Sequence, residues 1–341
     1  MKKWLTDIFI VLFLFIGLLM MDLIIYGVSM GYGQFSIIYH SQPISCFVTQ
    51  PNVTPTQKEK IILIERIKKF TQDSLGFAPS DNYTSVYDQG DKPLMWVVTA
   101  CNKYSLTPYY WTFPVAGKVT YKGFFSQNMA EYEKQKLIQK GYDVKIRLVN
   151  AWSTLGWFND PIMTGFLEYD PGELSNLIIH ELSHGTIYVK GNTEYNENLA
   201  SFIGDQGATY FLSAFYGYNS KEYSEYQKNM HDEKLFTSYM IKSADQLDSL
   251  YGLHSFIKSP EYKKEILKNQ LVRNIVQHGL LLPFQDGEKY KKWLMKTELN
   301  NAGFIVFKQY NNQVDVFVKE FNQCCGGNIK KYIGFLKHKF N

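Results

Sequence analysis

Hydrophobic and polar residues alternate along this chain with two different periods. Apolar positions three or four residues apart predict helices over about 58–74 and 128–139, and a helical pattern with charged faces continues from about residue 221. Short runs rich in β-branched and aromatic residues predict strands at about 94–100, 111–113, 118–124 and 143–149. The second helix lies between the last two strands, which gives a β-α-β order. We therefore expect an α+β fold with a small mixed sheet, packed on the helix predicted to contain residues 180–184, and a mainly helical C-terminal lobe.

The N-terminal segment has the character of a membrane anchor. Two lysines precede an apolar run from Ile8 to Val28 that only Asp22 interrupts, and this run is long enough to span a bilayer. The lysines are expected to stay in the cytoplasm, which places the rest of the chain outside it. A cleaved signal peptide is the alternative, although no typical cleavage site is visible. The expected parts are an anchor (1–30), a membrane-proximal segment that ends in a linker (31–57) and a folded domain (58–341).

Composition narrows the class of protein. The chain has 341 residues, of which 45% are hydrophobic and 20% charged, and these values are typical of globular proteins with a sizeable core. A net charge of +4 without a basic stripe gives no reason to expect binding to nucleic acid. Cys46 and Cys101 could pair in an oxidising compartment, and none of the four cysteines lies in a metal-binding C-x-x-C pair.

A predicted helix that begins after Asp170 carries the most specific motif of the chain. Asp170 and Pro171 are typical of a helix start, and an apolar run leads from there into an H-E-x-x-H sequence at residues 180–184. Histidines four positions apart lie on one face of a helix, about 6 Å apart along its axis, so both can bind one metal ion. Two purely structural histidines are the alternative, but a largely buried helix makes unpaired polar groups costly.

Glu181 follows the first of these histidines and would lie beside the metal without binding it. A carboxylate in this position can take a proton from the attacking water and pass it to the leaving amine. The motif is therefore typical of zinc peptidases. It predicts Zn²⁺ as the cofactor, a peptide as the substrate and Glu181 as the general base.

A zinc site needs a third protein ligand besides His180 and His184. Gly191 is expected to end the first helix, and Asn192 or Thr193 to cap a second one. If the first helix continues to this turn and the second packs against it in the antiparallel direction, Glu197 returns to the level of His184. Glu194, one turn earlier, is the rival ligand.

The second predicted helix carries small residues that would let two helix backbones approach closely, namely Ser201, Gly204, Gly207 and Ala208. Asp205 lies two turns beyond Glu197 on nearly the same face, where it could accept a hydrogen bond from a liganding histidine. Asp205 and Ser201 are therefore candidates for contacts around the ligands. Candidate donors to a developing oxyanion are Tyr188 and Tyr195, with Tyr121, His254 and His278 also conceivable.

The stretch from Phe113 to Ala208 resembles a bacterial family of predicted zinc aminopeptidases. Besides H-E-x-x-H and the pair Asn196-Glu197, the similar pieces are residues 113–117, 121–125, 153–161 and 188–193. The resemblance implies a zincin-like, gluzincin-like catalytic domain. It implies His180, His184 and Glu197 as zinc ligands and Glu181 as base.

The sequence has no Gly-x-Met-Glu-Asn-like segment of the kind with which better-known zinc aminopeptidases hold the free amine of a substrate. The site therefore predicts peptide hydrolysis without fixing an exopeptidase preference. Two alternatives stay open: a membrane-tethered binding protein with a structural metal, and a metal hydrolase that acts on amide bonds of cell-wall peptides.

Overall fold

The computed structural model describes residues 21–90, 92–113, 117–149, 159–309 and 314–340. Most of the predicted anchor therefore lies outside the described residues, whose first element is helix α2 (Met21–His40). Among the helices of the described ranges, none is both long enough and apolar enough to cross a membrane. The fold is α+β, mainly helical with small sheets.

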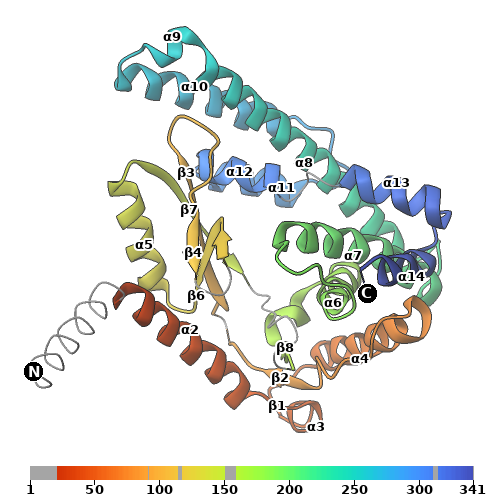
Figure 1. The fold of residues 1–341 in the computed structure, drawn as a ribbon. Helices are drawn as coiled ribbons and strands as arrows, with labels where there is room; N and C mark the ends of the chain where they lie inside the picture. Colours follow the sequence, from red (N-terminus) through yellow and green to blue (C-terminus); the bar gives the residue numbers. More distant parts are fainter. Residues whose placement is uncertain (1–20, 91, 114–116, 150–158, 310–313, 341) are drawn as a thin grey trace, which may run out of the picture.

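Two antiparallel helices form the centre of the larger hydrophobic core (Figure 1). These are α6 (Pro171–His184) and α7 (Thr193–Phe215), with α4 (Pro55–Phe70) and α8 (Lys221–Gly252) packed against α6. The apolar run of α6 before the histidines is buried in this core. The most specific motif of the sequence therefore lies on one of the best-packed helices.

Side-chain caps explain where these helices begin. The carboxylate of Asp170 accepts the backbone N–H of Glu173 at 2.8 Å, as the sequence predicts for the start of α6. Thr54 and Gln57 form a reciprocal capping box, so α4 begins at Pro55 and not at the predicted residue 58. The predicted linker is correspondingly shorter, and α4 continues at its other end into a π-helical turn, η1 (Thr71–Leu75).

A three-stranded antiparallel sheet has β3 (Met95–Asn102) at its centre, between β6 (Tyr121–Phe124) and β7 (Tyr142–Val149). Helix α5 (Gln127–Gln139) connects the two outer strands, which confirms the predicted β-α-β order. Because side chains alternate along a strand, Val98 and Ala100 pack with α5, while Cys101 packs with α12 (Asn301–Gln309) on the opposite face.

The remaining strands form two smaller sheets. One is mixed and consists of β1 (Gln42–Pro43), β2 (Ser85–Tyr87) and β8 (Ile162–Met163). The other is a hairpin of β4 (Trp111–Phe113) and β5 (Gly117–Val119). The predicted strand 118–124 is thus divided between β5 and β6, which belong to different sheets.

The predicted strands pack mainly between α5 and α12 and reach the core of the H-E-x-x-H helix only at one end of the sheet, through Met95 and Val149. The sheet that packs on this helix is instead the mixed sheet, which contributes Val86, Ile162 and Met163 to the core of α6. Strands β2 and β8 contain three and two residues, too few to produce a recognisable alternation of polar and apolar positions.

The described residues from 221 onwards are mainly helical, as predicted. Helix α8 forms a long hairpin with α9 (His254–Ile257) and α10 (Glu261–Gly279), and α11 (Glu288–Lys296) and α12 lead back toward the sheet (Figure 1). Helices α13 (Val314–Cys325) and α14 (Ile329–Phe340) then pack on α7. The predicted helical lobe is thus divided, because its last two helices join the core of α6 and α7.

Two short elements complete the described chain: α3 (Ile44–Phe47) and the 3₁₀ helix η2 (Thr164–Glu168). Cys46 is exposed and Cys101 is buried, and both are free thiols. The disulfide that the sequence left open between them is not formed.

The contact between α6 and α7 depends on glycine, as the small residues of α7 predict. A Cβ atom at Gly207 would lie 2.8 Å from Cγ2 of Ile179, and one at Gly204 would lie 3.1 Å from the carbonyl oxygen of Asn176. The helices therefore approach more closely than any larger residue would permit. Ala208 is buried beside this contact, whereas Ser201 is exposed and takes no part in it.

We predict that Gly207→Ala lowers the free energy of unfolding by about 1–3 kcal/mol, because the added methyl group overpacks a rigid core. Gly334→Ala is the matched control, since Gly334 is exposed within α14 and has no neighbour within 4 Å. There the removal of backbone freedom should raise the free energy of unfolding by up to about 1 kcal/mol. Urea denaturation of both variants measures these effects, and equal stabilities would contradict the close-contact interpretation.

Candidate metal centre

His180, His184 and Glu197 lie together at the end of the α6–α7 pair where a loop connects the two helices. Each offers one ligand atom, and these three atoms lie within 4.8 Å of one another. One carboxylate oxygen of Glu197 is 3.6 Å from Nε2 of His180, and the other is 3.7 Å from Nε2 of His184. The structure thus brings together the three residues that the sequence predicts as ligands.

The donor set fits a divalent metal such as zinc. Two imidazole nitrogens and a carboxylate oxygen are typical of zinc sites, and bonds of about 2.1 Å in tetrahedral geometry place ligand atoms roughly 3.4 Å apart. The separations of 3.6 and 3.7 Å are close to this value and longer than a normal hydrogen bond. A cation would also coordinate the carboxylate oxygens of Glu197 and the Nε2 atoms of the histidines, which otherwise face one another without a hydrogen bond.

Helix α6 ends directly after His184, which differs from the predicted continuation toward Gly191. The carbonyl of Ser183 accepts the amides of both Thr186 and Ile187 at 2.9 Å, which closes a tight turn. The side chain of Ile187 is buried in the core, so tertiary packing draws the chain out of the helix here. A loop therefore spans the distance that the sequence assigned to a helix.

Helix α7 nevertheless begins where the sequence predicts. The side chain of Asn192 accepts the amide of Tyr195 at 3.2 Å and caps the helix. Glu197 then lies about one turn into α7 and faces the histidines of α6. The rival ligand Glu194 is exposed and is not part of the cluster of possible metal ligands found among the described residues.

Two buried asparagines on either side of Glu197 fix its position. The amide of Asn196 forms two hydrogen bonds with the backbone of Val189, at 2.8 and 2.9 Å, and so ties the loop to α7. Asn198 donates to the carbonyls of Glu194 and, at 3.5 Å, Gln309, which is the last residue of α12. The pair Asn196-Glu197 was noticeable in the sequence, but these long-range partners were not.

Burial and nearby charge set the protonation of the ligands. Burial lowers the pKa of His184 to about 4, which favours the neutral imidazole that a metal requires. Burial also lowers the pKa of His180, but the neighbouring carboxylates of Glu197 and Glu181 outweigh it, so the net pKa of His180 is raised. Burial raises the pKa of Glu197, but the two histidines and Arg147 lower it by more. The net pKa of Glu197 is therefore depressed.

Nδ1 of His184 is buried and has no hydrogen-bond partner within the described part of the chain. Liganding histidines commonly donate this second nitrogen to a carboxylate or carbonyl. The sequence offered Asp205 for that role. The structure instead pairs Asp205 with Asn176 of α6, at 2.7 Å, and with the hydroxyl of Tyr226 of α8, at 3.5 Å.

Asp205 influences the centre through its charge, because it contributes to the raised pKa of His180. Burial, reinforced by Glu233, raises the pKa of Asp205 itself to about 6. Ser201, the other predicted neighbour of the ligands, is exposed and forms no side-chain hydrogen bond with a described residue.

Glu181 lies on α6 between the two histidines and is partly buried. The charge of Glu181 affects Tyr83, a residue that the sequence did not single out. Burial raises the pKa of Tyr83 well above the ordinary value, and the charges of Glu181 and Asp160 raise it further. Tyr83 has φ of 62°, and in the described ranges it is the one residue other than glycine with positive φ. Such strained positions concentrate at functional sites.

The loop around Tyr83 is held by Asp160. The amide of Tyr83 donates to the carbonyl of Asp160 at 2.7 Å, and the amide of Asp160 donates to the side chain of Asn82 at 3.1 Å. No periodicity or motif in the sequence indicates this contact, because it joins segments that are far apart in the chain. Most of the similar piece 153–161 lies outside the described residues.

The predicted oxyanion donors come from different elements of the fold. Tyr195 packs edge-on against Phe317 and Phe340, on the side of α7 that meets α13 and α14. Tyr188 is exposed in the loop after α6. Of the other conceivable donors, Tyr121 begins β6, His254 begins α9 at the end of the long helical hairpin, and His278 bonds to the backbone of its own helix.

Comparison with known families agrees with this geometry. A family model described as "Putative aminopeptidase" matches residues 25–338. No curated protein and no solved structure matches the chain. The match covers both the helical pair that holds the candidate ligands and the helices that pack around it.

We predict that Asp205→Asn changes how stability depends on pH. The pKa of Asp205 in the folded protein, about 6, exceeds the ordinary 3.8, so the folded state holds this proton more tightly. The stabilisation is present below pH 4 and is lost as the pH rises through 6. Between pH 4 and 8 the wild type should therefore lose up to about 3 kcal/mol relative to Asp205→Asn.

Urea denaturation of the chelator-treated proteins at several pH values measures this difference. Asp73→Asn serves as the control, because Asp73 is exposed on η1. A difference between Asp205→Asn and wild type that stays constant over this pH range would refute the raised pKa.

Proposed function

Because the chain belongs to this aminopeptidase family, we propose that it is a zinc-dependent peptidase that hydrolyses peptide bonds. Family membership supports a peptidase. The observation that carries the finer proposal is the convergence of His180, His184 and Glu197 beside Glu181. This arrangement is that of a zincin with glutamate as third ligand, and we propose a zincin-like, gluzincin-like catalytic domain on the same grounds.

The three converging side chains would hold the zinc ion. When bound, zinc supplies Lewis acidity, which polarises the scissile carbonyl and makes water a nucleophile near neutral pH. The three-residue donor set supports a catalytic site, since structural zinc sites usually have four protein ligands.

Glu181 provides proton transfer at this site. Its carboxylate accepts a proton from the attacking water and donates it to the nitrogen of the leaving amine. The partly buried setting of Glu181 limits the access of bulk water to this carboxylate. The hydrogen bonds of Asn196 and Asn198 keep Glu197 in place while the substrate binds.

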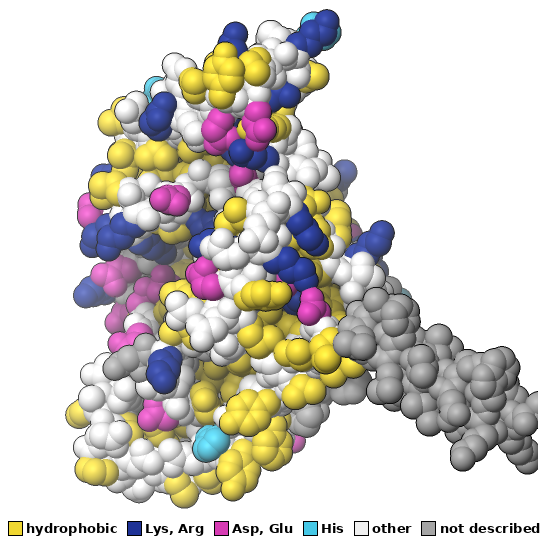
Figure 2. Space-filling view, turned by 90° about the vertical axis from the view of Figure 1, so that its left-hand side faces the viewer, with side chains coloured by type: hydrophobic (Ala, Val, Ile, Leu, Met, Phe, Trp, Pro, Cys, Tyr) yellow, Lys and Arg dark blue, Asp and Glu magenta, His cyan; other side chains and the backbone are white. Residues whose placement is uncertain are grey.

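We also propose that the protein is tethered to a bacterial membrane by its N-terminal segment, with the catalytic domain outside the cytoplasm. Helix α2 supports this, because its exposed side includes Ile24, Ile25, Val28, Tyr32 and Phe35. Figure 2 shows apolar side chains gathered on the lower part of one face, at the level where α2 lies in Figure 1.

The membrane proposal is tested by fractionation. The full chain should stay with membranes after a carbonate wash, whereas a chain without residues 1–20 should be released by it, because the uninterrupted apolar run is then lost. Equal release of both proteins would contradict a tether in this segment.

The catalytic proposal predicts different outcomes for two substitutions. Glu181→Gln should keep the zinc content of the wild type but lower peptide hydrolysis by about 100-fold or more, because the base is lost while the ligands remain. His184→Ala should lose both zinc and activity. Elemental analysis measures the metal, and digestion of a peptide library with and without chelator measures activity and cleavage position.

Glu194→Gln is the matched control, since Glu194 is an exposed glutamate on the same helix turn as Glu197. It should behave as the wild type in both assays. Zinc bound at full stoichiometry without hydrolysis of any peptide would instead indicate a structural metal in a binding protein.

A further inference from the structure

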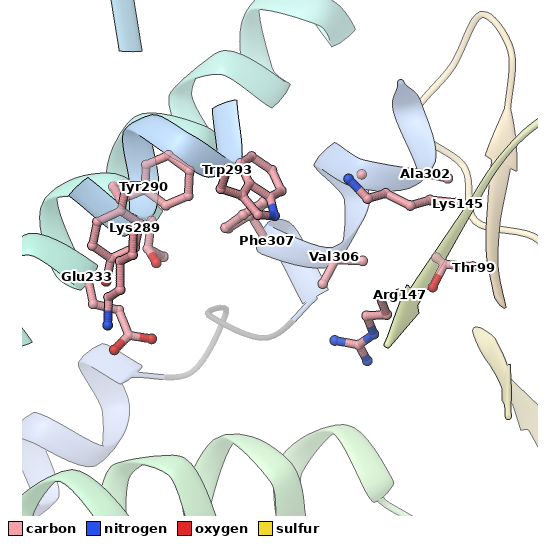
Figure 3. A pocket seen from close by; sticks show the side chains of 13 residues that line it. Thr99, Lys145, Arg147, Glu233, Lys289, Tyr290, Trp293, Ala302, Val306 and Phe307 are labelled. Carbon is pink, nitrogen blue, oxygen red and sulfur yellow. The ribbon is translucent and has the colours of Figure 1, made fainter. Parts of the chain in front are cut away.

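A cavity of about 430 Å³ lies between the sheet and the helices that follow residue 221. Strand β7, with one residue of β3, forms one wall, and helices α8, α11 and α12 form the others. In Figure 3 Lys145 and Arg147 lie on one side of the cavity, across from Glu233, Lys289 and Tyr290. Trp293 and Phe307 lie between the two sides, so the cavity has cationic groups within a partly aromatic lining.

Lys145 is the unusual group of this cavity. It is two residues from Arg147 on β7, so both side chains lie on the same face of the sheet, opposite α5. The ammonium of Lys145 is buried and has no hydrogen-bond partner among the described residues. It lies 4.7 Å from the ring centroid of Trp293. A buried ammonium without a hydrogen-bonded anion is costly, and a bound anion would remove that cost.

The other lysine of the cavity is already paired. Lys289 lies 3.3 Å from the carboxylate of Glu173, which belongs to the first turn of α6. Glu233 lines the same side of the cavity as Lys289, and its negative charge would repel an anionic ligand there. An incoming anion is therefore directed to the side of Lys145.

The start of helix α11, which carries Trp293, is held in place by a buried carboxylate of α8. The buried carboxylate of Asp232 accepts three backbone amides from residues 285–287, at 2.7, 2.9 and 3.0 Å. These residues lead directly into α11, which places Lys289, Tyr290 and Trp293 around the cavity. The lining is thus held in position before any ligand binds, which reduces the cost of binding.

The charges of two lining residues and one hydrogen bond connect the cavity with the candidate metal centre. Arg147 lines the cavity and lowers the pKa of the ligand Glu197. Glu233 lines the cavity and raises the pKa of Asp205 on α7. Helix α12, which forms one wall, ends at Gln309 against Asn198, the residue after Glu197. The cavity is thus linked to the candidate metal centre through α12 and through two charged side chains of its lining.

We propose that the cavity binds a carboxylate of the peptide substrate, with Lys145 as its cationic partner and the aromatic rings in contact with the adjoining side chain. This assignment rests on the proposed peptidase function, because carboxylates are the anionic groups that an unmodified peptide contains. The carboxylate has two sources, the C-terminus of a short peptide or an acidic side chain. Either source would make binding depend on an anion at a set position of the substrate.

The electrostatics of Lys145 agree with the geometry. Burial lowers the pKa of Lys145 to about 8. A carboxylate in hydrogen-bond range would favour the charged form of the ammonium again.

Binding of three peptides to the Glu181→Gln protein in zinc-containing buffer tests the proposal, because this variant should bind peptides without consuming them. The peptides are leucyl-glycyl-phenylalanine, its C-terminal amide, and the amide of leucyl-glycyl-glutamate. Calorimetry should show that the free acid binds about tenfold more tightly than its amide. Tight binding of the glutamate peptide as well would assign the carboxylate to a side chain, and weak binding would assign it to the C-terminus.

Substitution of Lys145 in the same protein completes the test. Lys145→Met should remove the preference for the carboxylate, Lys145→Arg should retain much of it, and Lys118→Met, at an exposed position of β5, should not change it. Equal binding of acid and amides, a preference that survives Lys145→Met, or no binding at millimolar concentration would overturn the assignment. Hydrolysis assays of the wild type decide the proposed function separately, since either result there leaves the binding comparison valid.

Discussion

The close antiparallel contact of α6 and α7 is the constraint on which the candidate centre depends. Two of its ligands are four positions apart on one helix, but the third comes from the other helix and can reach them only if the backbones nearly touch. Gly204 and Gly207 provide this approach, and the buried apolar side of α6 holds the pair in the core. The geometry of the candidate centre and the packing of the core are therefore properties of the same interface.

Around this interface the polar groups are arranged in two sets. Close to the ligands, buried amides of Asn196 and Asn198 fix the backbone of α7 through the loop and through α12. Deeper between the helices, Asp205 joins Asn176 and Tyr226, so that α6, α7 and α8 share one buried polar cluster. These groups determine where the helices meet along their length, which hydrophobic contacts alone specify less strictly.

Local signals in the sequence predicted the parts of the fold that local chemistry determines. The caps at Asp170 and Asn192, the principal strands and the pair of histidines follow from residues within one or two turns of each other. The end of α6 was predicted wrongly, because burial of Ile187 against distant residues overrides helix propensity.

The strands of the mixed sheet beside α6 were missed for a related reason, since they are too short to have a period. Tyr83, Arg147 and Asn198 reach the centre only through folding of segments that are far apart in the sequence. The pair of histidines was accessible from the sequence because spacing on a helix is a local property, and Glu197 was accessible because a short turn predicts that the next helix packs against the first. The groups that hold and tune this ligand set were not accessible in this way.

The packing of α13 and α14 on α7 has a consequence for the order in which the protein matures. Tyr195, two residues before Glu197, is covered by rings from both of these helices, and Phe202 contacts Phe317, Phe321 and Tyr332. During synthesis, the histidine-bearing segment emerges long before the residues that cover its partner helix. The packing that holds Glu197 opposite the two histidines is therefore complete only after α13 and α14 have been synthesised.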